Sequence, residues 1–148
     1  MSPIRLADET ATQDLGRALA RALQPGDALC LTGPLGAGKS TLARALIRAL
    51  TTPDEEVPSP TFTLVQFYET AAFPLAHFDL YRLTDPDEAY EIGLDEALDG
   101  GVALIEWPQR LEGRLPPTRL DIDIALDGDA RGVTVTRHGG FEGRTLEF

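Results

Sequence analysis

One segment constrains this chain more than any other: residues 33–40, Gly-Pro-Leu-Gly-Ala-Gly-Lys-Ser, which match the phosphate-loop pattern G-x-x-x-x-G-K-[ST]. The apolar residues 28–32 before it are typical of a short buried strand. Residues 41–50 after it carry apolar side chains at helical spacing, with Arg44 and Arg48 together on another face. Strand, glycine-rich loop and helix form the context that the pattern requires, so the sequence predicts an α/β fold with a P-loop core.

The chemistry of such a loop follows from its backbone and its lysine. Glycines let several N–H groups curl inward around an anion, and the start of the helix adds partial positive charge. Lys39 is the only lysine among the 13 basic residues, and its compact ammonium reaches between phosphates in a way that a planar guanidinium does not. We therefore expect Lys39 to contact the β- and γ-phosphates of ATP and the Ser40 hydroxyl to ligate Mg²⁺. The predicted nucleotide-binding residues of the loop are Gly33, Leu35, Gly36, Ala37, Gly38, Lys39, Ser40 and Thr41.

Length and composition bound the class of protein. The chain has 148 residues, 43% of them hydrophobic, which predicts one compact domain over residues 1–148. No apolar run approaches the length of a membrane span, and residues 1–10 lack the apolar region of a secretory signal. Cys30 is the only cysteine, and we expect it to be a buried core residue with no intrachain disulfide. These features predict a cytoplasmic protein.

The charge balance bears on partners. The net charge is −11, from 24 acidic and 13 basic residues. Direct, electrostatically driven binding of nucleic acid needs a basic patch, so this composition argues against it. If RNA is involved, we expect a partner to hold it.

The rest of the chain predicts further strands and helices around the P-loop. Strands are expected over residues 3–6, 61–68, 75–79, 102–106, 120–126, 133–135 and 144–148. A helix is expected over 8–23, a mostly helical acidic segment over 86–97, and a short helix or turn over 107–115. The predicted fold class is therefore a P-loop core with a mostly parallel sheet flanked by helices, followed by antiparallel strands at the C-terminal end.

Two acids follow apolar runs at the ends of predicted strands. Glu106 follows Val-Ala-Leu-Ile, and Asp79 follows Leu-Ala-His-Phe. Carboxylates at the carboxyl ends of strands line the ligand crevice of open α/β sheets, where they can bind Mg²⁺ or orient an attacking water. The alternative is that either acid simply caps the next turn. Glu106 is the better metal candidate, although the pattern alone leaves open which acid binds the metal and which positions the water.

Three further side chains have both a functional and a plain structural interpretation. Thr61 in Ser-Pro-Thr, or Thr63 in its place, would sense the γ-phosphate in a switch-like loop or serve ordinary turn chemistry. Arg82 would act as an arginine finger or form a surface salt bridge. Trp107 would contact a partner or stack on a base, although an aromatic side chain beside a buried strand is usually part of the core.

Four motifs in order make the chain resemble a known family. They are Leu35-Gly36-Ala37-Gly38-Lys39-Ser40, Ser59-Pro60-Thr61-Phe62-Thr63-Leu64, His77-Phe78-Asp79-Leu80-Tyr81-Arg82-Leu83 and Ile105-Glu106-Trp107-Pro108. Together with Asp14-Leu15-Gly16, they resemble the bacterial TsaE (YjeE) family of small ATPases required for threonylcarbamoyladenosine modification of tRNA. The likeness covers most of residues 8–110, and only the P-loop among these motifs is widespread.

The resemblance implies roles by matching position. Ser40 and Glu106 would bind Mg²⁺, and Asp79 would lie in a switch-II-like element near the metal and the water. Residues 59–64, including Thr61, would be switch I, and Trp107 would be a functional neighbour of Glu106. Adenine would lie between the N-terminal segment and the C-terminal strands, where the matching positions are Glu9, Thr10 and Arg131.

The resemblance also implies partners. The family binds a complex of TsaD and TsaB and uses ATP to sustain repeated turnovers, so we expect weak ATP hydrolysis alone, activation by these partners, and only indirect contact with tRNA at position 37. A small-molecule kinase is the first alternative, although residues 119–148 predict strands where a kinase would have a helical C-terminus. The second is a nucleotide-dependent binding module without essential catalysis. A GTPase is disfavoured because its Asn-Lys-x-Asp element needs a second lysine.

Overall fold

The computed structural model describes residues 4–34, 36–60 and 63–146. In that part of the chain seven strands form one sheet in the order β1-β7-β6-β2-β5-β4-β3. The strands are β1 (Ile4–Leu6), β2 (Ala28–Thr32), β3 (Val65–Glu69), β4 (Pro74–Asp79), β5 (Val102–Glu106), β6 (Arg119–Asp127) and β7 (Ala130–His138). The helices are α1 (Glu9–Ala22), α2 (Lys39–Leu50), α3 (Asp87–Glu91) and α4 (Leu94–Leu98), with 3-10 turns at Pro108–Leu111 and Gly139–Phe141.

The centre of the sheet is parallel and its edges are antiparallel. Strand β2 pairs in parallel with both β5 and β6, and β5 pairs in parallel with β4. The outer pairs β1–β7, β6–β7 and β3–β4 are antiparallel. The predicted combination of a parallel P-loop core with an antiparallel C-terminal pair is therefore confirmed. The carboxyl ends of β2, β5 and β4 meet at one edge of the sheet, which is where ligands bind in such folds.

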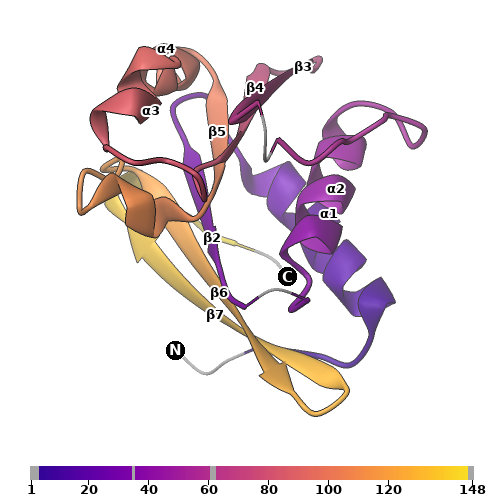
Figure 1. Ribbon diagram of the computed structural model, residues 1–148. Coiled ribbons are helices and arrows are strands. Elements are labelled where there is room, and N and C mark those ends of the chain that lie inside the picture. Colours follow the sequence, from indigo (N-terminus) through magenta and orange to yellow (C-terminus); the bar gives the residue numbers. More distant parts are fainter. Residues whose placement is uncertain (1–3, 35, 61–62, 147–148) are drawn as a thin grey trace.

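Helices cover both faces of the sheet (Figure 1): α1 and α2 lie side by side on one face, and α3 and α4 lie on the other. Side chains alternate along each strand, so Leu29 and Leu31 of β2 pack in the core under α1 and α2, whereas Cys30 packs under α3 and α4. Gly16 allows α1 and α2 to approach closely, because a Cβ there would lie 2.8 Å from the Leu42 carbonyl oxygen. The P-loop helix α2 is thus packed closely against α1 on one face of the sheet.

Three predicted elements differ from the structure. Strand β3 begins at Val65, because Leu64 has a φ of 67° that ends an extended strand; residues 61–62 lie outside the described residues. The acidic segment 86–97 forms two short helices, because Gly93 has a φ of 100° between them. No strand forms over Arg144–Leu146, where Arg144 instead reaches back to the start of β2.

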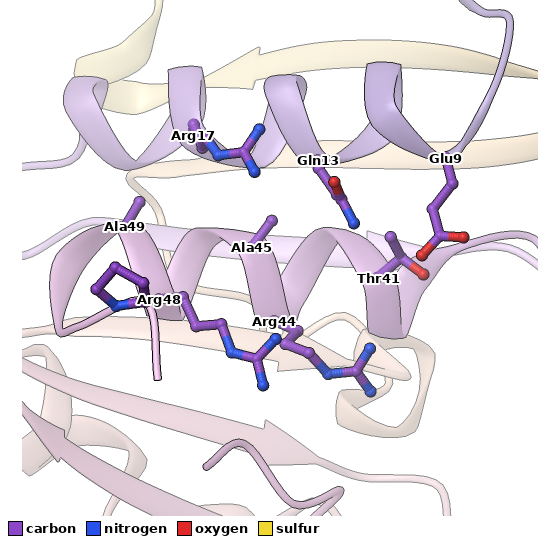
Figure 2. Close-up of a pocket in the computed structure, with 9 residues that line it drawn as sticks. Glu9, Gln13, Arg17, Thr41, Arg44, Ala45, Arg48 and Ala49 are labelled. Atoms are coloured by element: carbon purple, nitrogen blue, oxygen red, sulfur yellow. The ribbon is translucent and has the colours of Figure 1, made fainter. Parts of the chain in front are cut away.

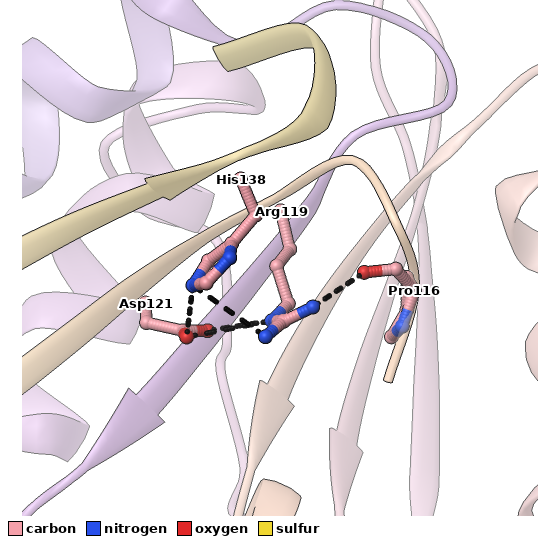
Figure 3. A network of polar contacts seen from close by, with 4 residues as sticks. All are labelled: Pro116, Arg119, Asp121 and His138. Carbon is pink, nitrogen blue, oxygen red and sulfur yellow. Dashed lines mark hydrogen bonds and ion pairs between the residues drawn. The ribbon is translucent and has the colours of Figure 1, made fainter. Parts of the chain in front are cut away.

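A polar network fastens the loop before β6 to the last two strands (Figure 3). Arg119 donates from Nε to Asp121 Oδ1 at 3.1 Å and from Nη1 to the Pro116 carbonyl at 3.1 Å. His138 Nε2 lies 3.0 Å from the second oxygen of Asp121. Each group has a partner inside the network, which indicates a structural role.

Cys30 lies in the middle of β2 and is 1% exposed, as predicted. Burial, and then the nearby Asp121 carboxylate, raise the pKa of its thiol to about 12. The thiolate, which is the reactive form, is therefore scarce near neutral pH. Within the described residues, none of the helices has both the length and the apolar character needed to cross a bilayer.

Candidate functional site

The predicted P-loop connects β2 to α2 at the carboxyl edge of the parallel strands. Gly33 has a φ of 142°, and a Cβ there would lie 2.4 Å from the Ile124 carbonyl oxygen, so only glycine fits. Gly38 has a φ of 112° and is the N-cap of α2, with no side chain to satisfy the first N–H groups of the helix. These N–H groups and the positive end of the helix dipole point to an anion at this place.

A cavity of about 260 Å³ lies beside the loop and brings the predicted residues together. Lys39, Ser40 and Thr41 come from the start of α2, and Asp79, Glu106 and Trp107 come from the ends of β4 and β5. The remaining lining residues are Gly36, Gly38 and Ser59.

The two predicted acids are neighbours in the sheet. Asp79 and Glu106 are paired in register at the ends of the parallel strands β4 and β5. Side-chain alternation places both on the α1–α2 side of the sheet, because Leu75 and Leu104 precede them by even numbers of residues on that face. Each acid is 7% exposed. Asp79 Oδ1 also accepts a hydrogen bond from the Tyr81 N–H at 3.1 Å, which fixes the turn after β4.

The Glu106 carboxylate is contacted by the imidazole of His77. His77 Nε2 lies 2.8 Å from Glu106 Oε2, and both side chains are buried. His77 Nδ1 is also buried and has no hydrogen-bond partner in the described part of the chain. A carboxylate oxygen accepts hydrogen bonds, so His77 Nε2–H is the donor in this contact with Glu106. This bond fixes one carboxylate oxygen of Glu106.

The lysine of the loop is buried beside an aromatic ring. Lys39 is 7% exposed, and its ammonium lies 4.5 Å from the centroid of the Trp107 ring. Trp107 is half-buried and contacts Tyr81, with ring centroids 4.9 Å apart. In the described residues no carboxylate lies within ion-pair distance of Lys39. A buried cation without an anion is costly, so the site fits an anionic ligand such as a phosphate.

The oxygen-bearing groups fit a magnesium ion bound together with phosphates. No cluster of three or more histidine, cysteine or acidic side chains that would make an all-protein metal cage occurs in the described part of the chain. Mg²⁺ usually keeps several waters and takes one or two protein ligands plus phosphate oxygens. The Ser40 hydroxyl and the Glu106 and Asp79 carboxylates around one cavity suit that kind of binding.

A second cavity, of about 240 Å³, adjoins the loop on the side of the terminal segments. Two of the three positions predicted to contact adenine, Glu9 and Arg131, line it, whereas Thr10 is exposed and is absent from its described lining. The Arg131 guanidinium donates to the carbonyls of Ala37 at 3.1 Å and Gly36 at 3.3 Å, so β7 braces the loop.

Three other predicted residues are not among the described residues that line the phosphate cavity. Leu35 and Thr61 lie outside the described residues. Arg82 is exposed just after β4 and is absent from the described lining of that cavity. Sequence reasoning assigned no role to His77; its place two residues before Asp79 puts both on one face of the strand, but only the pairing of β4 with β5 reveals Glu106 beside it.

The fold and the loop define the class: this is an α/β protein of the P-loop type. A family model described as "Threonylcarbamoyl adenosine biosynthesis protein TsaE" matches residues 6–133. The chain belongs to the TsaE family, which acts in threonylcarbamoyladenosine biosynthesis, and the predicted resemblance is confirmed.

Named relatives agree with this assignment. The chain is 40% identical over 127 residues to the tRNA threonylcarbamoyladenosine biosynthesis protein TsaE of Rickettsia felis, covering 85% of this chain and 74% of the relative. It is 39% identical over 137 residues to the Bacillus subtilis TsaE, covering 91% and 85% of the two chains. The crystal structure of Bacillus subtilis YdiB superposes with a TM-score of 0.76 at 34% identity, covering 95% of this chain and 88% of that one.

Proposed function

We propose that this protein binds Mg²⁺-ATP and hydrolyses it slowly in support of N6-threonylcarbamoyladenosine formation at position 37 of tRNA. The observation that carries the proposal is the buried Lys39, which has no carboxylate partner among the described residues and lies beside two strand-terminal acids. Family membership supports the pathway. The proposed role in tRNA modification supports a cytoplasmic location, and the proposed partners are TsaB- and TsaD-type proteins that hold the tRNA.

The proposed roles follow from charge and position. Lys39 and the N–H groups at the start of α2 hold the phosphates and stabilise the charge that develops as the terminal phosphoryl group leaves. Ser40 and Glu106 would hold Mg²⁺, which supplies charge neutralisation at the phosphate oxygens. Asp79, beside Glu106 in the sheet, orients the attacking water. His77 keeps Glu106 in one orientation through the 2.8 Å contact at Oε2.

The test of the metal assignment is Glu106→Ala. We expect ATP affinity to change little, and Mg²⁺-dependent hydrolysis to fall about 100-fold, because the lost interaction acts mainly in the transition state. Glu69→Ala is the matched control, since Glu69 also ends a strand but is exposed at the sheet edge. Normal hydrolysis by Glu106→Ala would show that this carboxylate does not serve the metal.

The partner assignment needs a separate experiment. ATP hydrolysis is measured for the protein alone, with a TsaB–TsaD pair, and with a panel of small metabolites followed for phosphorylation. Strong stimulation by the pair supports the proposal. Activity that ignores the pair but phosphorylates a metabolite would instead establish the kinase alternative, and nucleotide binding without hydrolysis in every condition would establish a binding module.

A further inference from the structure

A second concave site lies between α1 and α2, away from the phosphate cavity. It is a depression of about 390 Å³ whose walls carry Arg17 on α1 and Arg44 and Arg48 on α2. Figure 2 shows the Arg44 and Arg48 side chains projecting together from α2, with Arg17 on the facing helix and Ala45 between the helices. Among the described lining residues, Glu9 is the one acid. We call this depression the arginine groove.

The guanidinium groups of the groove retain most of their hydrogen-bonding capacity. Arg44 has no hydrogen bond or ion pair within the part of the chain that the structure describes. Arg48 donates its Nε to the Glu55 carbonyl at 3.1 Å. Arg17 pairs with Asp14 at 2.7 Å, but both side chains are largely exposed, and such pairs are weak. An incoming anion would therefore find donors available on both helices.

This concentration of positive charge is unusual for the chain. The protein has a net charge of −11, whereas the described lining of the groove holds three arginines and one glutamate. The lining therefore carries a net positive charge within an acidic protein. Each guanidinium offers a planar fork that matches a carboxylate or phosphate in two-point contact. The chemistry of the groove therefore points to an anionic ligand.

The surroundings favour carboxylates on a protein over the phosphates of RNA. No aromatic side chain occurs among the described residues that line the groove, so bases would have no surface on which to stack. The net charge of −11 also repels a long polyanion more than a short acidic peptide. We propose that the arginine groove docks a segment of a partner protein that is rich in aspartate and glutamate.

The groove adjoins the nucleotide region, although the proposal does not depend on nucleotide chemistry. Glu9 and Thr41 line both the arginine groove and the second cavity beside the loop, and Thr41 also lines the phosphate cavity. An acidic segment in the groove would therefore lie next to the start of α2, where the loop ends.

The test measures binding of a fluorescent poly-glutamate peptide to the full chain at low ionic strength. We expect the double variant Arg44→Glu/Arg48→Glu to bind about tenfold more weakly, since two attractions become repulsions, and binding to the unmodified chain to weaken with salt. Arg21→Glu is the matched control, because Arg21 is an exposed arginine of α1 outside the described lining of the groove. Thermal melting checks that each variant folds, and Arg44→Gln/Arg48→Gln provides a milder change if the reversal unfolds the helix.

Each outcome decides the proposal. Loss of peptide binding in the groove variants and its retention in Arg21→Glu support it, particularly when an uncharged poly-glutamine peptide does not bind. Equal loss in Arg21→Glu, or no peptide binding at all, overturns it. A labelled RNA hairpin is run in parallel; RNA binding that depends on Arg44 and Arg48 without peptide binding overturns the proposed occupant in favour of nucleic acid.

Discussion

Two buried charges lie at opposite ends of strand β2 and have opposite surroundings. Asp27, just before β2, is 2% exposed and receives two hydrogen bonds from the Arg144 guanidinium, at 2.6 and 3.1 Å. It also accepts from the Gln24 N–H at 2.7 Å. Lys39, beyond the other end of the strand, is 7% exposed, and among the described residues its ammonium contacts an aromatic ring and no carboxylate.

The difference indicates a structural role for the Asp27 charge and suits a ligand-binding role for the Lys39 charge. Taking a charge out of water is expensive, and a buried charge is stable only with a partner of opposite sign. Asp27 has that partner inside the chain, because Arg144 lies 117 residues away in sequence and contacts it. The charge of Asp27 is therefore compensated within the protein itself. Lys39 lacks one among the described residues, an arrangement that suits the binding of an anionic ligand.

The largest expected effect comes from breaking the buried pair of Asp27 and Arg144. Asp27→Asn leaves the Arg144 guanidinium, which is 17% exposed, without a counter-charge. We expect the free energy of unfolding to fall by about 3 kcal/mol, the usual result of removing one partner of a buried pair. Chemical denaturation measures it, and Asp14→Asn, which breaks an exposed pair with Arg17, should change it by less than about 0.5 kcal/mol. Equal effects of the two variants would show that burial does not distinguish these pairs.

The next largest effect is expected from replacing the buried Lys39. Lys39→Ala should weaken ATP binding by about 100-fold, because the phosphates lose a desolvated charge partner. Its free energy of unfolding should stay within about 1 kcal/mol of the unmodified protein or rise, because an unpaired buried charge is removed. Titration calorimetry and denaturation together measure both. A strongly destabilised variant that still binds ATP normally would make Lys39 a structural residue and erase the contrast with Asp27.

A smaller effect is expected from replacing His77, which contacts the Glu106 carboxylate. His77→Leu removes the donor to Glu106 Oε2 and should lower hydrolysis about tenfold while raising the Mg²⁺ concentration needed for tight ATP binding. His77→Gln keeps an N–H at a similar reach and should restore much of both properties. The readout that separates positioning from folding is ATP affinity as a function of Mg²⁺. If His77→Leu and His77→Gln behave alike at every Mg²⁺ concentration, the hydrogen bond does not orient Glu106.

The smallest expected effect concerns Cys30, in the middle of strand β2. With the pKa of Cys30 raised to about 12 by burial and by Asp121, the folded protein should show almost no thiol alkylation at pH 8. Because the unfolded thiol ionises at lower pH than the folded one, this group adds stability below pH 9 that is lost as the pH rises toward 12. Mass spectrometry follows the alkylation, with a denatured sample as the positive control. Rapid reaction in the folded state would show that β2 opens.

Much of the fold was predictable because patterns among neighbouring residues indicate its helices and strands. Apolar runs marked β2 and β5, helical spacing marked α1 and α2, and the glycine spacing marked the loop between β2 and α2. The errors fell where backbone conformation overrode the pattern, as at Leu64, whose positive φ shortens β3, and at Arg144, which packs on Asp27 instead of forming a strand. The contact of Arg144 with Asp27 joins residues 117 positions apart, so no local pattern could signal it.

By itself, the sequence determined that a P-loop joins a strand to a helix and that Asp79 and Glu106 end two strands, because these features depend on neighbouring residues. Only the tertiary structure decided that β4 pairs with β5. That pairing sets Asp79 beside Glu106 and brings His77 to within 2.8 Å of its carboxylate. It was also the packing of α1 on α2 that gathered three arginines around one groove. The physical reason is that strand register and helix packing are set by burial of the whole core, which links residues far apart in the chain.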